Sequence, residues 1–120
     1  MPDLKISEML EMQKELFEPH KDKWPPMEPE AGRNFLLFMV EEMGEAIAII
    51  KKKGDRAIMD DASVRGAFCE EMADVIMYYN DTLLRYGITT EEISKAYLEK
   101  HAKNMGRDYQ AEYENKYKKD

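Results

Sequence analysis

A single cysteine, Cys69, occurs among the 120 residues, so no disulfide can form within one chain. A chain without an internal disulfide is typical of the reducing cytoplasm. The sequence also lacks any apolar run near the roughly 18 residues that a membrane-spanning helix needs, and residues 1–5 do not resemble a secretion signal. We therefore expect a soluble, cytoplasmic protein that has no membrane partner.

Basic residues are in the minority: 18 Lys and Arg stand against 25 Asp and Glu, which gives a net charge of −7. Such a chain repels polyanions, so we expect no nucleic-acid polymer as a partner. The charge does not exclude a small nucleotide that is held through a metal ion. With 43% hydrophobic and 36% charged residues, the 120 residues are expected to form one globular domain with long solvated helix faces.

No segment shows the strict alternation of a half-buried strand, whereas apolar residues recur at helical spacing. We predict an all-α fold, a four- to five-helix bundle formed by residues 1–120 as a single domain. The helices are expected at about 4–17, 33–53, 62–86 and 89–106, followed by a partly helical tail at 108–118. Asp3 and Pro19 mark the two ends of the first helix, and the basic turn Lys51–Lys53 before Gly54 marks the end of the second. The third helix starts after Asp60 or Asp61 and ends at Gly87, and the capping box of Thr89 and Glu92 starts the fourth.

Residues 18–32 hold four of the five prolines and the single tryptophan, Trp24. The segment lacks the Gly/Ser richness of a flexible linker, so we predict an ordered loop, and long loops often carry function. Trp24 either stacks on a planar ligand or fills the core where the loop crosses the helices. Both interpretations stay open.

The two long central helices differ in where their polar residues fall. On the helix at 62–86, a core stripe of Cys69, Met72, Ile76 and Leu83 is predicted. On the helix at 33–53, an apolar stripe is formed by Leu36, Met39, Met43, Ile47 and Ile50. Glu42 and Glu45 lie on a flank with Phe35 and Phe38, which predicts that these carboxylates are partly desolvated.

Carboxylate pairs at spacing i, i+3 occur on both central helices: Glu42 with Glu45, and Glu71 with Asp74. Residues three apart share one helix face, and a short connection makes an antiparallel hairpin of the two helices. Four carboxylates that meet in such a hairpin would repel one another unless a cation neutralised them. Ligation by oxygen alone favours Mg²⁺, with Mn²⁺ as a substitute, over zinc. The alternative is that both pairs are ordinary solvated acids.

A di-iron bundle is disfavoured because its sites use Glu-x-x-His motifs. Neither His20 nor His101 follows a helix glutamate by three residues. On the last long helix, Lys100, Asn104 and Arg107 form a polar stripe that could contact phosphate oxygens, provided that the helix continues past Gly106.

Three motifs together resemble the MazG-like, all-α nucleoside triphosphate pyrophosphohydrolases. The sequence EEMGE at 41–45 and EMAD at 71–74 match the E-x-x-E and E-x-x-D pair of that superfamily, and KHAKNMGR at 100–107 resembles its K-x-x-x-N-x-x-R segment. Tyr78, four residues after Asp74, matches a tyrosine of the dCTP-pyrophosphatase-like branch. The resemblance covers residues 33–109; Gly106 departs from the pattern, so Arg107 is the weakest match.

The resemblance implies that Glu42, Glu45, Glu71 and Asp74 bind Mg²⁺, and that Lys100, Asn104 and Arg107 contact phosphates. It implies hydrolysis of a (d)NTP between the α- and β-phosphates, for nucleotide-pool house-cleaning, in a homodimer or homotetramer. Glu41 either orients the attacking water or faces solvent. Trp24, Tyr78 and Phe38 are candidates for contacts to the nucleoside. The alternatives are a phosphoribosyl-ATP pyrophosphohydrolase, a dUTPase-like enzyme, or a non-catalytic helical interaction module.

Overall fold

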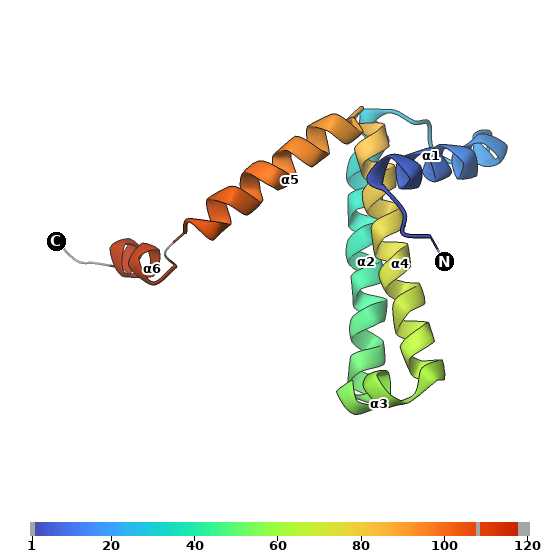
Figure 1. Cartoon of the computed structure of the whole chain (residues 1–120). Coiled ribbons are helices and arrows are strands. Elements are labelled where there is room, and N and C mark those ends of the chain that lie inside the picture. The colour runs from blue at the N-terminus through green and yellow to red at the C-terminus, as the bar shows by residue number, and fades with distance from the viewer. Residues whose placement is uncertain (1, 108, 118–120) are drawn as a thin grey trace. The chain divides into compact units, whose positions relative to one another are not determined.

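A computed structural model describes residues 2–107 and 109–117 of the chain (Figure 1). The described residues form helices joined by turns and short extended stretches, and no strand occurs among them, as the all-α prediction requires. The elements in chain order are α1 (Ile6–Phe17), the 3₁₀ turn η1 (Glu18–His20), α2 (Pro29–Lys53), α3 (Asp55–Asp60), α4 (Ala62–Arg85), α5 (Thr90–Met105) and α6 (Tyr109–Tyr117).

The chain divides into two compact units, residues 1–89 and 90–120, and each is described by itself. In the first unit, α2 and α4 run antiparallel side by side, and the short α3 closes the hairpin at one end (Figure 1). Gly54 makes the turn out of α2 possible because its φ of 86° lies in the region that favours glycine. The Asp61 side chain then caps α4 by accepting hydrogen bonds from the backbone N–H groups of Ser63 and Val64.

The seam between α2 and α4 contains polar as well as apolar residues. The more buried positions recur every three or four residues, as expected for a helix pair. Those with this spacing are Gly32, Phe35, Met39, Glu42, Ala46 and Ile49 on α2 and Val64, Phe68, Glu71, Val75, Tyr78, Thr82 and Arg85 on α4. Other α4 residues, among them Asp74, Asp81 and Leu83, are also buried or half-buried. Glu42 and Glu71 therefore occupy seam positions, which agrees with the predicted desolvation of Glu42. The same prediction is wrong for Glu45, which is exposed because it lies off the seam.

The core stripe predicted for the helix at 62–86 is wrong at three of its four positions. Leu83 is buried, but Cys69 is exposed and Met72 and Ile76 remain 44% and 45% exposed. The face of α4 that carries Glu71 and Tyr78 packs against α2 instead. Periodicity alone cannot distinguish two apolar faces of one helix, and the more apolar face lies outside the hairpin.

The helix boundaries differ from the predicted ones mainly at the N-terminal ends. α1 begins at Ile6, so Asp3 is not its N-cap. Instead, the backbone N–H of Lys5 donates a hydrogen bond of 2.8 Å to the Glu8 carboxylate. α2 begins at Pro29, four residues before the predicted start, because proline fits the first helical turn where its missing N–H is not needed. The predicted loop 18–32 is correspondingly shorter.

The second unit contains α5 and α6. α5 ends at Met105, so Arg107 lies just beyond it, and the predicted tail at 108–118 forms α6 except for residues 108 and 118, which lie outside the described residues. No helix of the described chain is both long enough and apolar enough to cross a lipid bilayer.

Candidate metal centre

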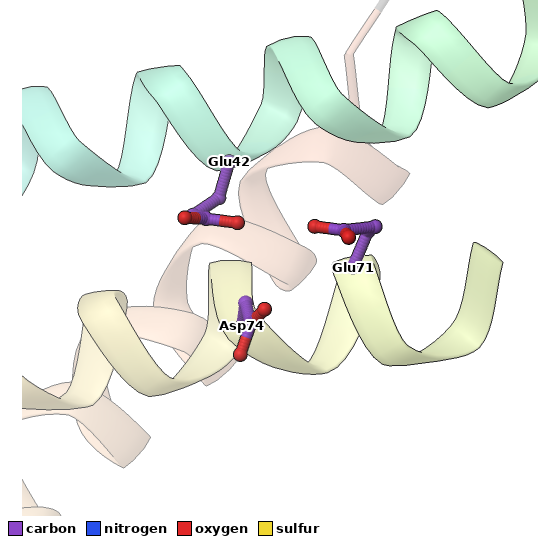
Figure 2. Close-up of side chains that lie close together, drawn as sticks. All are labelled: Glu42, Glu71 and Asp74. Atoms are coloured by element: carbon purple, nitrogen blue, oxygen red, sulfur yellow. The ribbon is translucent and has the colours of Figure 1, made fainter. Parts of the chain in front are cut away.

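Three carboxylates meet across the α2–α4 seam: Glu42 projects from α2 toward Glu71 and Asp74 on α4 (Figure 2). One oxygen of each lies within 4.8 Å of the corresponding oxygens of the other two. The spacing i, i+3 places Glu71 and Asp74 on one face of α4, and the antiparallel hairpin brings Glu42 opposite both. We call Glu42, Glu71 and Asp74 the acidic cluster.

Partial burial and the repulsion of neighbouring carboxylates both act on Glu42. Loss of solvation raises the pKa of Glu42, and a hydrogen bond to Glu71 and the charges of Asp74, Glu71 and Glu45 raise it further. Each of these causes disfavours the charged form of Glu42 in the absence of a cation. A divalent cation would remove the repulsion because it neutralises the carboxylates that cause it.

The geometry of the acidic cluster suits a small hard cation. Two oxygens bound to one Mg²⁺ at about 2.1 Å each can lie no more than about 4.2 Å apart. Oxygens within 4.8 Å of one another thus need only small side-chain movements to bind the same ion. All three residues are partly exposed, which leaves room for the water molecules that Mg²⁺ usually retains.

The remaining predicted acids lie outside the acidic cluster. Glu45 is exposed on α2, one turn beyond Glu42, and acts on Glu42 through its charge. Glu41 is also exposed, and its charge contributes to raising the pKa of Tyr78. The structure thus brings together three of the four predicted metal ligands, and the roles of Glu45 and Glu41 stay predictions.

Next to the acidic cluster is a hollow of about 390 Å³, which we call the aromatic hollow. Its walls come from α1, the loop after η1, α2 and α4. Its lining residues are Gln13, Leu16, Trp24, Pro25, Phe35, Phe38, Asp74, Met77, Tyr78 and Asp81. Asp74 belongs both to this hollow and to the acidic cluster. A ligand could therefore fill the hollow and reach a cation at the cluster.

The three predicted nucleoside-contacting residues, Trp24, Phe38 and Tyr78, all line the aromatic hollow. Phe35, Phe38 and Tyr78 contact one another edge-on or tilted, with ring centroids 5.3–6.1 Å apart. Burial, followed by the charges of Glu42 and Asp74, raises the pKa of Tyr78, so its phenol keeps its proton as a hydrogen-bond donor at neutral pH.

Trp24 packs against the end of α1 and also lines the aromatic hollow, while its stacking on a ligand stays a prediction. Its ring stacks on His20 with centroids 4.3 Å apart and lies 6.4 Å from the Phe17 ring, so it packs against the end of α1. It nevertheless remains partly exposed and lines the aromatic hollow. His20 is thereby a packing partner of Trp24, and no histidine belongs to the acidic cluster.

Lys100, Asn104 and Arg107 belong to the second unit, and all three are exposed. Lys100 and Asn104 lie four residues apart on α5 and share one of its faces. Arg107 follows α5 and forms an ion pair with Glu112, with Nε and Oε2 2.6 Å apart. Their contact with phosphate stays a prediction.

Sequence reasoning missed a buried polar group beside the aromatic hollow: Gln13, Asp81 and Arg85. The only sequence signal is the i, i+4 spacing of Asp81 and Arg85, which usually marks a solvent-exposed ion pair. Their burial depends on the loop and α1 covering the end of α4, which no local pattern reports.

In comparisons with models of protein families, with curated proteins and with solved structures, the chain has no match. The candidate site therefore rests on its own geometry and chemistry.

Proposed function

We propose that this protein is a Mg²⁺-dependent nucleoside triphosphate pyrophosphohydrolase of the MazG-like, all-α type. It would cleave a (d)NTP between the α- and β-phosphates and release (d)NMP and pyrophosphate, as a nucleotide-pool house-cleaning enzyme. The observation that carries the proposal is the position of Asp74, shared by an acidic cluster suited to a hard cation and an aromatic hollow suited to a planar base.

In this proposal Glu42, Glu71 and Asp74 would hold Mg²⁺, with Glu45 as a fourth ligand and Mn²⁺ as a substitute. The ion supplies charge neutralisation for the triphosphate and a bound water of lowered pKa. Glu41 is the candidate for orienting that water, because it is the neighbour of Glu42 on α2.

The nucleoside end of the substrate would occupy the aromatic hollow. Stacking of a base on an aromatic side chain is worth about 1–3 kcal/mol and tolerates every base. Trp24 and Phe38 offer ring faces or edges, and the protonated Tyr78 can donate a hydrogen bond near the sugar. The preferred base and sugar depend on hydrogen bonds that these rings do not supply.

Phosphate contacts are assigned to Lys100, Asn104 and Arg107, from the same chain or from another copy. Arg107 would exchange its ion pair with Glu112 for a phosphate. That exchange is feasible because exposed ion pairs contribute only about 0–1 kcal/mol.

We further propose a homodimer or homotetramer. Among the described residues, only Leu10, Phe35, Ala46 and Leu83 are buried hydrophobic side chains. A large apolar surface on α2 and α4 remains exposed at Leu36, Leu37, Val40, Met43, Ile47, Ile50, Met72 and Ile76. Uncovered apolar patches on this scale usually mark protein–protein contacts, and a second copy would supply a core that one hairpin lacks.

The deciding experiment assays pyrophosphate and orthophosphate release from a panel of (d)NTPs with Mg²⁺. Pyrophosphate with a nucleoside monophosphate is expected, whereas orthophosphate release would exclude cleavage between the α- and β-phosphates. Preference for phosphoribosyl-ATP or dUTP would favour the other two enzyme classes. If calorimetry finds no divalent-cation binding at millimolar concentration, the chain is instead a non-catalytic helical interaction module.

A further inference from the structure

A buried ion pair lies behind the wall of the aromatic hollow. Arg85, the last residue of α4, and Asp81, one turn earlier, are each only 1% exposed. The Arg85 Nε donates a hydrogen bond to Asp81 Oδ1, and the Gln13 Nε2 donates to Asp81 Oδ2 at 3.2 Å. The pair thereby joins α4 to α1. Because two buried charges are costly to desolvate, apolar residues of similar size would stabilise the fold as well or better.

Arg85 also holds the loop that carries Trp24. Its Nη1 donates hydrogen bonds to the backbone carbonyl of Pro25, at 3.0 Å, and to that of Pro26. Prolines have no N–H, so this segment cannot fix itself by donating backbone hydrogen bonds at either position. The backbone of Trp24 bonds back to His20, and that of Glu28 to Pro26. Between these local turns, Arg85 ties the segment to the α2–α4 hairpin.

The same guanidinium group lies over the Phe35 ring, with the Arg85 Cζ 3.7 Å from the ring centroid and 5.8 Å from that of Phe17. Phe35, Pro25 and Asp81 all line the aromatic hollow, whereas Arg85 itself does not. Arg85 therefore touches three parts of the wall from behind. One rigid, planar group fixes a ring, a loop and a carboxylate in a common arrangement.

We propose that Arg85 is a positioning residue for the aromatic hollow: through the Pro25 and Pro26 carbonyls it holds Trp24 in place as a wall of the nucleoside site. The effect on substrate rests on the proposed function, but the effect on Trp24 does not. Arg85 acts on binding of the nucleoside and not on the metal ion, because the acidic cluster is formed by the middle parts of α2 and α4.

The test compares Arg85→Lys with Arg65→Lys, a matched change on the exposed face of the same helix. Lysine keeps the charge beside Asp81 but cannot bond two carbonyls and a carboxylate in one plane. Trp24 is the only tryptophan, so acrylamide quenching of the intrinsic fluorescence reports on it alone, without any nucleotide. Quenching is expected to rise in Arg85→Lys and to stay at the wild-type level in Arg65→Lys.

With nucleotide and Mg²⁺, Arg85→Lys is expected to raise KM about tenfold, the equivalent of one charge-assisted hydrogen bond, while kcat changes little. Mg²⁺ affinity measured by calorimetry should equal that of the wild type. A merely structural role would lower the melting temperature without separating KM from kcat. Unchanged quenching in Arg85→Lys, or a loss confined to kcat, would overturn the proposal.

The two proposals fail separately. If the wild-type protein hydrolyses no nucleotide, the proposed function is wrong, and the ligand-free quenching still decides the role of Arg85. If Arg85→Lys does not fold, the paired change Asp81→Leu with Arg85→Met replaces the ion pair by apolar residues, which proteins often tolerate. Trp24 should be more accessible in that folded protein, and wild-type accessibility there would overturn the positioning role.

Discussion

Glu42 and Glu71 face each other from adjacent helices, and a hydrogen bond between their carboxyl groups helps to raise the pKa of Glu42 (Figure 2). Two carboxyl groups can hydrogen-bond only while they share a proton. A divalent cation would take the place of that proton, so proton binding and metal binding are expected to compete at one point of the α2–α4 seam.

The first prediction concerns pH. Because the pKa of Glu42 is raised above its ordinary value of 4.5, the native state binds this proton more tightly than the unfolded state. Without Mg²⁺, this proton should therefore make its full contribution to the free energy of unfolding below a pH of about 4.5, the ordinary pKa of the group. The contribution should be lost as the pH rises from there through the raised pKa of Glu42 in the native state. Thermal unfolding at a series of pH values, with and without Mg²⁺, measures this trend.

Mg²⁺ should abolish much of that decrease and should bind less tightly as the pH falls, because the proton must leave first. Glu42→Gln is the control: it removes the titrating group and should remove this component of the pH dependence. A decrease of equal size in Glu42→Gln would show that other groups cause it.

The second prediction tests whether Glu71, a member of the acidic cluster, matters more for Mg²⁺ binding and activity than its exposed neighbour Glu70. Glu71→Gln removes a seam carboxylate, whereas Glu70→Gln removes the adjacent, exposed one. Loss of a metal ligand is expected to cost about 3 kcal/mol, or roughly 100-fold in kcat/KM, and to weaken Mg²⁺ binding in calorimetry. Glu70→Gln should behave as wild type. Equal effects of the two changes would mean that the overall negative charge, not the acidic cluster, attracts the cation.

The third prediction uses Trp24. A (d)NTP analogue that resists hydrolysis should change the fluorescence of this single tryptophan when Mg²⁺ is present. Trp24→Ala should raise KM about 5- to 150-fold, which corresponds to the roughly 1–3 kcal/mol of one stacked base. Trp24→Phe keeps an aromatic ring and should lose less, and neither change should alter Mg²⁺ affinity. A KM that stays constant in Trp24→Ala would leave Trp24 as a core residue only.

The fourth prediction tests the packing of the loop end of α2. A Cβ atom on Gly32 would lie 2.3 Å from the Tyr86 ring, so Gly32→Ala forces that ring to move. Overpacking of a core costs about 1–3 kcal/mol, but Tyr86 is 47% exposed and its ring can move toward solvent, so the cost at Gly32 is expected at the low end of that range. The higher helix propensity of alanine offsets part of it, since Gly32 lies within α2. Gly66→Ala on α4 meets open space and should stabilise the protein by about 0.5–1 kcal/mol, since alanine favours helix. Chemical denaturation of both variants measures the difference, and Gly32→Ala is expected to be less stable than Gly66→Ala.

The fifth prediction concerns assembly. Light scattering at micromolar concentration should give a dimer or tetramer. Val40 is 53% exposed in the single chain, so Val40→Lys should change the stability of the monomer little. The charge should weaken association strongly, because it would be buried between two copies. Ala96→Lys, at an exposed position of α5, adds the same single positive charge and is the control. A wild-type monomer at this concentration would disprove the homo-oligomer.

Local signals in the sequence determined most of the helices. The basic turn Lys51–Lys53 with Gly54 marks the end of α2, and Asp61 marks the start of α4, because capping and helix-dipole effects act within one turn. The i, i+3 spacing likewise fixed which carboxylates share a face. The sequence pattern predicts Pro29 in the loop, because a proline by itself does not show whether it follows a turn or begins a helix.

The tertiary structure alone decided which faces of the helices are buried. The apolar stripe of α4 that contains Met72 and Ile76 is predicted to be buried, but it lies outside the hairpin, while Glu71 takes a seam position. The tertiary structure also decided that Asp81 and Arg85 are buried. Arg85 binds the carbonyls of Pro25 and Pro26, which lie sixty and fifty-nine residues away along the chain. Helix formation depends on neighbours within a few residues, whereas burial depends on what other segments cover.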